Sequence, residues 1–259
     1  MKESFLRKLL CILYLFLFLL FPSKAQTGKF YSTNNELSSS LINQIFQDSR
    51  GFIWVATEYG LNRFDGFRFV DYMHVTGNTS SIKDNYVRTV FEDSKQNLLV
   101  GCINGLMKYD RSTDSFHEVP MLRKGKQVFP HVVQMCELHN NEIWIVTAGQ
   151  GLFKLIGDFD KAQSVDEIMQ KGNYLFLRNI YEDAQRNIWI GTEGNGILCY
   201  TPVNKKVMTF KTPTINDNNI SSIIEDKNGN LFVGTQKHGI SRYDRQTKRF
   251  IPVSYSGNE

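Results

Sequence analysis

The stretch Gln185-Arg-Asn-Ile-Trp-Ile-Gly-Thr-Glu-Gly-Asn-Gly-Ile-Leu-Cys-Tyr200 decides the fold, because copies of it recur along the chain. One copy runs Asn228-Gly-Asn-Leu-Phe-Val-Gly-Thr-Gln-Lys-His-Gly-Ile-Ser-Arg-Tyr243, and another runs Arg50-Gly-Phe-Ile-Trp-Val-Ala-Thr-Glu-Tyr-Gly-Leu-Asn-Arg-Phe64. Weaker copies span Gln96 to Tyr109 and Asn141 to Leu155. One large apolar residue, called the anchor below, falls at Trp54, Leu99, Trp144, Trp189 and Phe232, so the steps are 45, 45, 45 and 43 residues. This period indicates a propeller or a solenoid rather than an unrepeated enzyme domain.

Each copy predicts four short strands. A short apolar segment comes first, and a polar turn follows it whose Asp precedes the anchor by six residues, at Asp48, Asp93, Asp183 and Asp226, with Leu138 as the exception. After the anchor strand a turn ends in glycine, and a third strand follows. A fourth strand is marked by Phe69, Phe116, Phe210 and Phe250. The third copy has no clear fourth strand and carries an insertion at Gly157–Asn173, in which Val165–Gln170 predicts one helical turn or two.

Four antiparallel strands in about 45 residues are typical of one β-propeller blade, and they argue against a solenoid. The predicted fold is all-β, with five blades at residues 37–80, 81–127, 128–172, 173–215 and 216–259. Because the sequence stops where a sixth blade would begin, we expect an incomplete or N-terminal part of a larger propeller. The anchors should lie in matching seams between neighbouring blades, where their burial is the main stabilising contribution.

The first 25 residues predict a cleaved secretory signal peptide. Basic residues precede thirteen apolar residues, Leu9–Phe21, and small residues at Ser23 and Ala25 mark cleavage after Ala25. Thirteen residues are too few to span a bilayer as a helix. Residues 26–36 form a lead-in, no membrane span is expected in the mature chain, and the protein should be periplasmic or secreted.

Charge excludes nucleic acid as a partner. The formal net charge is +4, and removal of Lys2, Arg7, Lys8, Lys24 and Glu3 with the signal peptide lowers it to +1. A nearly neutral protein exerts no long-range attraction on nucleic acid or other acidic polymers.

No catalytic, metal or cofactor site is predicted. The five histidines lack ligand spacing, and no nucleophile elbow, phosphate loop or dinucleotide fingerprint is present. Three cysteines remain in the mature chain, Cys102, Cys136 and Cys199, and each occupies a position of the repeat at which other copies hold a different residue. A role as small buried residues is therefore favoured over redox chemistry.

One set of positions suits ligand binding. The residue before the glycine after each anchor strand should lie on the same propeller face in every blade, and it differs in each copy: Tyr59, Asn104, Gln150, Asn195 and His238. Variable residues on a rigid scaffold are typical of recognition, amides can bind sugar hydroxyls, and Tyr59 could stack on a sugar ring. A variable solvated loop is the alternative.

The repeats resemble the two-component regulator propeller family over about Leu37 to Val253. The most specific part is Leu37-Ser-Ser-Ser-Leu-Ile-Asn-Gln-Ile-Phe-Gln-Asp-Ser-Arg-Gly-Phe-Ile-Trp-Val-Ala-Thr-Glu-Tyr-Gly-Leu-Asn-Arg-Phe-Asp-Gly-Phe67, which is similar to the opening of the periplasmic sensor of hybrid two-component histidine kinases. The resemblance implies two large propellers, an immunoglobulin-like domain, a membrane helix, a kinase, a receiver and a DNA-binding module, with oligosaccharides as signals. The sequence contains neither the second propeller nor the kinase, and Leu99 and Leu138 depart from the repeat.

Three functional hypotheses follow. The first is a non-enzymatic periplasmic sensor that binds an oligosaccharide and acts with further propeller or sensor domains or with a homodimer partner. The second is a secreted propeller lyase or hydrolase, for which Glu58 and Glu193 in equivalent loops are the pair to test. The third is a protein-interaction scaffold without a small ligand.

Overall fold

The structure, a computed structural model, describes residues 28–33, 36–169 and 176–254. The chain divides after Tyr31, and the fold lies in the unit that begins at Ser32. The predicted signal peptide and its cleavage site lie outside the described residues. Among the residues that are described, no helix is long and apolar enough to cross a membrane.

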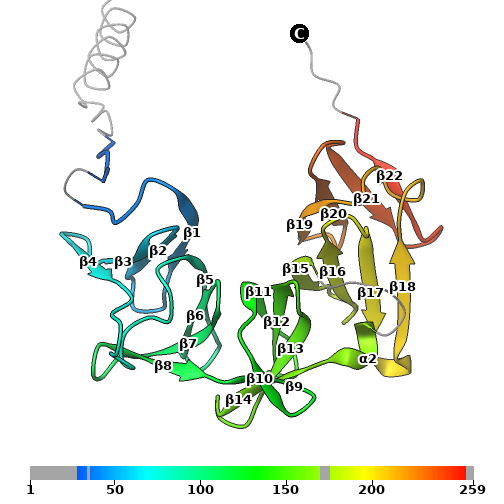
Figure 1. The fold of residues 1–259 in the computed structure, drawn as a ribbon. Helices are drawn as coiled ribbons and strands as arrows, with labels where there is room; N and C mark the ends of the chain where they lie inside the picture. Colours follow the sequence, from blue (N-terminus) through cyan, green and yellow to red (C-terminus); the bar gives the residue numbers. More distant parts are fainter. Residues whose placement is uncertain (1–27, 34–35, 170–175, 255–259) are drawn as a thin grey trace, which may run out of the picture. The chain divides into compact units, whose positions relative to one another are not determined.

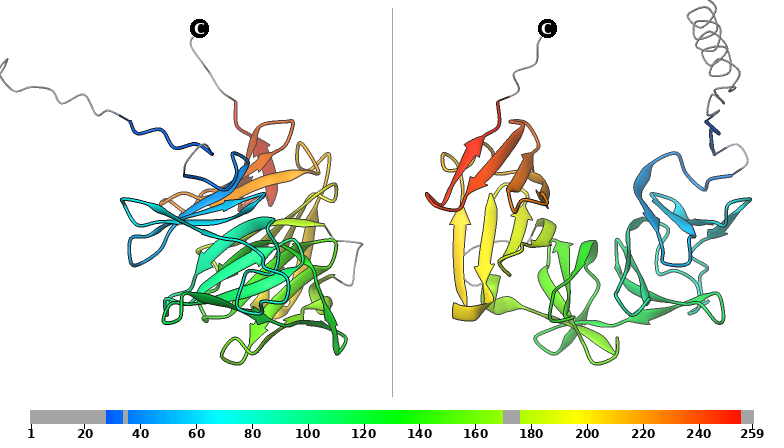
Figure 2. Two further views of the ribbon diagram at one scale, coloured as in Figure 1. Left: turned by 60° about the vertical axis from the view of Figure 1, so that its left-hand side comes forward. Right: turned by 180° about the vertical axis from the view of Figure 1, so that it is seen from behind.

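Five β-sheets follow one another in chain order (Figures 1 and 2). The first contains β1 Ile42–Gln47, β2 Ile53–Thr57, β3 Gly60–Phe64 and β4 Phe69–Tyr72. The second contains β5 Val87–Glu92, β6 Leu98–Cys102, β7 Gly105–Asp110 and β8 Ser115–Val119. The third contains β9 Met121–Arg123, β10 Lys126–Val128, β11 His131–Glu137, β12 Ile143–Ala148, β13 Gly151–Ile156 and β14 Lys161–Ser164. The fourth contains β15 Leu177–Glu182, β16 Ile188–Thr192, β17 Ile197–Thr201 and β18 Lys206–Phe210, and the fifth contains β19 Ile220–Glu225, β20 Leu231–Thr235, β21 Ile240–Asp244 and β22 Arg249–Pro252.

Four of the sheets are four-stranded antiparallel meanders, and the third contains the same meander with an added hairpin. The all-β propeller prediction is therefore confirmed. The four marker phenylalanines lie on fourth strands as expected, on β4, β8, β18 and β22.

The third sheet differs from its sequence interpretation in one respect. Its fourth strand does exist: β14 pairs antiparallel with β13 and lies inside the stretch interpreted as an insertion. The sequence Lys161–Ser164 contains no aromatic marker. Here the outer edge of the fourth strand is not free: β9 of the β9–β10 hairpin pairs with β14 in parallel. The predicted helical turn is present as α2, Asp166–Met169.

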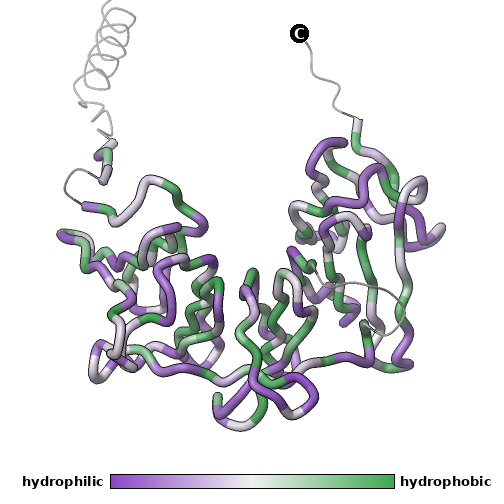
Figure 3. Tube along the Cα trace, viewed as in Figure 1, coloured by the Kyte–Doolittle hydropathy of each residue, from purple (hydrophilic) through white to green (hydrophobic). Residues whose placement is uncertain are grey.

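Four of the five anchors lie in matching seams, and the fifth, Phe232, is half-buried in the fifth sheet. Trp54 packs with Val90 and Val100 of the second sheet, and Leu99 packs with Met135 and Ile145 of the third. The other two seams repeat the arrangement, Trp144 with Ile180 and Ile190 and Trp189 with Leu231 and Val233. Apolar residues accordingly concentrate along the inner strands of the sheets (Figure 3). Each sheet thus buries one face on the next, as predicted.

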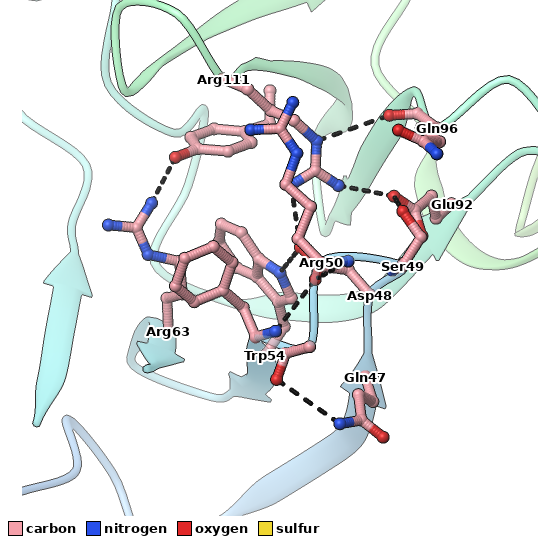
Figure 4. A network of polar contacts seen from close by, with 12 residues as sticks. Gln47, Asp48, Ser49, Arg50, Trp54, Arg63, Glu92, Gln96 and Arg111 are labelled. Atoms are coloured by element: carbon pink, nitrogen blue, oxygen red, sulfur yellow. Dashed lines mark hydrogen bonds and ion pairs between the residues drawn. The ribbon is translucent and has the colours of Figure 1, made fainter. Parts of the chain in front are cut away.

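The turn aspartates hold both the turn and the anchor. Asp48 accepts hydrogen bonds from the backbone N–H groups of Arg50 and Phe52 and from the indole Nε1 of Trp54, the last at 2.9 Å (Figure 4). Asp183 does the same around Trp189. The role of these aspartates as turn residues is confirmed.

The exception at Leu138 is compensated locally. Leu138 is buried and keeps the turn through backbone bonds alone. The indole of Trp144 donates instead to Glu142, at 3.0 Å. A carboxylate two residues before the anchor therefore replaces one six residues before it.

A second carboxylate links each sheet to the preceding one. The residue seven before the anchor is Glu in four sheets, and it accepts a backbone N–H from the turn of the sheet before: Ser49 to Glu92, Ser94 to Glu137, His139 to Glu182 and Ala184 to Glu225. Two arginines reinforce these links. Arg111 bridges Asp48 and Glu92 (Figure 4), and Arg245 bridges Asp183 and Glu225.

Candidate functional site

The first strand of each sheet lines the axis around which the sheets are arranged. These strands contact one another in sequence, β1 with β5, β5 with β11, β11 with β15 and β15 with β19. Each has a register shift at the same place, so one residue is left over opposite the second strand. The bulged residues are Asn43, Arg88, Val133, Arg178 and Ser221. Because a bulge redirects a side chain from the ladder, this position is the one the fold uses to present chemistry at the axis.

Three of the bulged residues line one cavity of about 240 Å3, which we call the axial pocket. Arg88 comes from β5, Arg178 from β15 and Ser221 from β19. The remaining lining residues are mostly polar: Asn179, Thr192, Glu193, Asn219, Ile220 and Gln236. A small cavity with guanidinium, amide, hydroxyl and carboxylate groups is equipped to bind a polar ligand.

The two arginines of the axial pocket have different partners. Arg178 forms an ion pair with Glu193, in which Nη2 and Nε lie 2.7 and 3.1 Å from Oε2. Both side chains are nearly half exposed, 45% and 48%, so this is a solvated pair. Arg88 is half-buried, and its Nη1 donates to Oδ1 of Asn43 at 3.2 Å. Within the described part of the chain, Arg88 forms no ion pair with a carboxylate.

Aromatic rings occur where the first strands of the second, third and fourth sheets begin. The His131 ring packs edge-on against Tyr86 with 5.7 Å between centroids, and Phe176 is 55% exposed at the equivalent position two sheets on from Tyr86. Burial lowers the pKa of His131, and the charges of Arg88 and Arg178 lower it further. His131 therefore stays neutral at pH 7, with the two guanidinium groups as its charged neighbours.

Two buried polar atoms near the axis lack a partner among the described residues. They are Nε2 of His131 and Oδ1 of Asn179. The amide nitrogen of Asn179 donates to the carbonyl of Ser221 at 3.1 Å, which fixes the direction of its oxygen. Such atoms are uncommon in folded proteins, and each can accept a hydrogen bond from a ligand.

The five residues predicted for ligand binding lie one in each sheet, and none of them lines the axial pocket. Tyr59 is exposed, and Asn104 donates to Asp84 beside a different cavity. The carbonyl of Gln150 accepts from Arg123. The side chain of Asn195 contacts Lys211, and that of His238 contacts Asp217. Their role in binding stays a prediction.

Sequence reasoning missed Arg88 and Arg178. The signal was present: both precede their anchors by eleven residues, a column that reads Asn43, Arg88, Val133, Arg178 and Ser221. Simple alternation along a strand hides this column, because it is the bulge that decides where these side chains point.

The two glutamates weighed for catalysis are not brought into one pocket. Glu193 lines the axial pocket, and Glu58 does not. The described residues include no group of three or more His, Cys, Asp or Glu side chains placed to hold a metal ion. The three cysteines are free thiols; Cys102 and Cys199 are buried, and Cys136 is half-buried.

Comparison with known proteins places the fold. A crystal structure of the extracellular domain of a hybrid two component system from B. thetaiotaomicron matches with 25% identity and a TM-score of 0.76, covering 86% of this chain and 31% of that one. A second such domain from the same organism matches with 21% identity and a TM-score of 0.71, covering 83% of this chain and 31% of that one. The chain thus spans about a third of the length of these relatives.

A more distant match shows the fold alone. Virginiamycin B lyase from Staphylococcus aureus matches with 13% identity and a TM-score of 0.63, covering 86% of this chain and 73% of that one. A comparison with curated protein sequences found no match.

The family model described as two component regulator propeller matches at residues 36–59, 171–194 and 214–237. These segments cover the first strand and the anchor strand of the first, fourth and fifth sheets, the sheets that keep both the turn aspartate and an aromatic anchor. The second and third sheets share the meander and the seams, although their sequences depart from the repeat. Three of the five sheets therefore contain a match to the two-component regulator propeller repeat.

Proposed function

We propose that this chain is the ligand-binding part of an exported two-component sensor and that it binds an oligosaccharide in the axial pocket. The observation that carries the proposal is the row of bulged residues. Five sheets use the same backbone irregularity to present side chains at the axis, and three of these side chains line one pocket. Packing alone needs no polar residue at this position, since Val133 occupies it in the third sheet.

The chemistry of the pocket suits a sugar. Amides and hydroxyls both donate and accept hydrogen bonds, as vicinal sugar hydroxyls require. Five residues on the blade loops remain predicted contacts for further sugar units of the ligand: Tyr59, Asn104, Gln150, Asn195 and His238.

Sensing requires that binding be communicated. The relatives are longer, and their descriptions name the extracellular domains of two-component systems. We propose a periplasmic or secreted location for this chain as well, with further sensor domains or a homodimer as the partner. Occupation of the axial pocket would favour one arrangement of these partners by its difference in affinity for the two states.

The enzymatic alternative rests on Glu193 and on the fold shared with a lyase. The fold alone does not carry an activity. Glu193 is nearly half exposed and paired with Arg178, and Glu58 does not line the axial pocket, so this pocket does not hold the pair of carboxylates that glycoside hydrolysis uses. A sugar-cleavage assay on the protein and on Glu193→Gln tests this alternative, which requires turnover that the variant loses.

The binding proposal is tested by isothermal titration calorimetry against a panel of di- to hexasaccharides. We expect one member to bind with 1:1 stoichiometry and Asn179→Ala to weaken that binding, because Asn179 lines the axial pocket. Asn140→Ala, in the exposed β11–β12 turn, is the matched control. Failure of every saccharide to bind would contradict the proposal and favour an interaction scaffold.

A further inference from the structure

We propose that the axial pocket selects an acidic saccharide, with a carboxylate or sulfate group bound by Arg88 and Arg178. This inference rests on the proposed function for the sugar, but the anion site is argued separately, from the charges that line the cavity. It differs from the expectation of a neutral sugar held by amides.

Arg88 is the principal evidence. Its guanidinium is half-buried, lines a cavity and forms no ion pair with any described carboxylate. Arginine stays charged at every physiological pH, so it cannot relieve partial burial by losing a proton. The same bulge position holds the neutral residues Asn43, Val133 and Ser221 in other sheets, and the fold therefore does not require a cation there. A ligand anion would supply the missing counter-charge.

The second guanidinium makes the pocket cationic overall. Its lining residues include two arginines and one glutamate, since Glu193 is the only acidic residue among them. Glu193 pairs with Arg178, and Arg88 forms no ion pair with a described carboxylate. Guanidinium groups bind carboxylates and sulfates through paired N–H donors, which is the strongest polar contact available to this cavity.

The remaining groups favour an anion that is part of a sugar over a simple ion. Oδ1 of Asn179 is a buried acceptor without a donor, and an anion would be repelled by it. A sugar hydroxyl satisfies that oxygen while the acid group of the same ring lies at the arginines. A cavity of about 240 Å3 is smaller than typical pockets of roughly 300 Å3 or more, which fits a single sugar residue.

The nearly neutral charge of the mature sequence does not conflict with this inference. Net charge governs long-range attraction, and it excludes an electrostatic search for polyanions. Two arginines in one pocket act over a few ångströms, and they discriminate after the ligand has arrived.

The experiment is calorimetry of the purified chain with four probes: trigalacturonate, a sulfated heparin disaccharide, neutral galactotriose and inorganic sulfate. Arg88→Gln removes the uncompensated charge with little change in volume. Arg50→Gln, in the exposed β1–β2 turn, is the matched control. Melting temperatures of both variants establish that they are folded.

We expect trigalacturonate or the heparin disaccharide to bind, galactotriose to bind at least roughly tenfold more weakly, and Arg88→Gln to weaken the acidic probe roughly tenfold or more. Arg50→Gln should change neither. The comparison of the two acidic probes distinguishes carboxylate from sulfate. Binding should weaken as salt rises, because the contact is between charges.

The failures are distinguishable. If galactotriose binds as well as the acidic probes, or if Arg88→Gln leaves acidic binding intact, the acidic ligand is overturned and the sugar-sensing proposal survives. If inorganic sulfate alone binds, and binds in an Arg88-dependent manner, the anion site stands and the saccharide is overturned. If no probe binds, both proposals fail.

Discussion

A methyl group added at Gly191 should destabilise the protein by a steric clash between the fourth and fifth sheets. Gly191 lies in β16 next to the first strand of the fifth sheet, and a Cβ atom there would meet Cγ2 of Ile220 at 2.6 Å and Cβ of Ile220 at 2.9 Å. Neither atom belongs to the flexible end of a side chain. Gly101 meets Val132 of the third sheet in the same way, at 2.6 and 2.9 Å.

Two opposing effects set the magnitude for Gly191→Ala. Loss of backbone freedom in the unfolded chain stabilises by about 0.4–1 kcal/mol where the conformation allows. Overpacking a well-filled core costs about 1–3 kcal/mol. We expect a net loss of about 1–2 kcal/mol in the free energy of unfolding, which corresponds to a fall of roughly 2–8 °C in Tm for a domain of this size.

The assay is urea and thermal unfolding of a double-mutant cycle with Ile220→Ala. That variant removes the nearest atom, Cγ2, and alone should cost about 2–5 kcal/mol. In its background Gly191→Ala should cost less, because the contact with Cγ2 is gone while Cβ at 2.9 Å remains. The expected coupling is at least about 0.5 kcal/mol. Equal costs in both backgrounds, or stabilisation by Gly191→Ala alone, would refute the seam. Gly101→Ala with Val132→Ala tests the second seam should Ile220→Ala fail to fold. Its coupling should be smaller, because Cγ2 of Thr89 also lies 2.7 Å from the added Cβ atom.

Further predictions concern buried charges and thiols. Burial raises the pKa of Asp183, but hydrogen bonds from Trp189 and Arg245 outweigh it and leave the pKa below 3.8. The pKa of Asp183 is therefore lower in the folded than in the unfolded protein, so its carboxylate stabilises the fold above about pH 4 and this contribution is lost as pH falls further. In thermal melts from pH 6 to pH 3, Tm should fall, and it should fall less in Asp183→Asn. Arg245→Gln should lower the free energy of unfolding in urea by about 3 kcal/mol, because the fully buried carboxylate of Asp183 loses its positively charged partner. Glu193→Gln at the solvated pair is the control and should cost no more than about 1 kcal/mol. Burial raises the pKa of the three described thiols to about 12, 11 and 12 for Cys102, Cys136 and Cys199. These thiols should therefore resist a thiol reagent at pH 8 until the protein is unfolded. Rapid labelling of the native protein would contradict this.

The fold was largely predictable because the period of the repeat shows which residues occupy equivalent packed positions. Anchors at a regular period imply equal environments, and Trp54, Leu99, Trp144 and Trp189 occupy four such seams, while Phe232 of the fifth sheet is half-buried. The fourth strand of the third sheet was missed, since Lys161–Ser164 carries no apolar pattern and the strand also pairs with β9 of the β9–β10 hairpin. Pairing between strands distant in sequence leaves no local signature.

The site was harder to predict for a physical reason. Reasoning from loops selected residues such as Asn195 and His238, which are held by Lys211 and Asp217 within their own neighbourhoods. The axial pocket is formed by bulged residues of three different sheets, and a bulge is a backbone feature that alternation does not reveal. Aligning the residues eleven before each anchor would have brought Arg88 and Arg178 together.

Hydrogen–deuterium exchange of the protein with and without its best-binding acidic saccharide tests the central claim most directly. Ligand in the axial pocket should slow exchange in peptides that contain Arg88 in β5 and Arg178 in β15, and leave the exposed β1–β2 turn around Arg50 unchanged. Protection confined to the blade loops that carry Tyr59 and His238, with β5 and β15 unaffected at saturating ligand, would contradict the account.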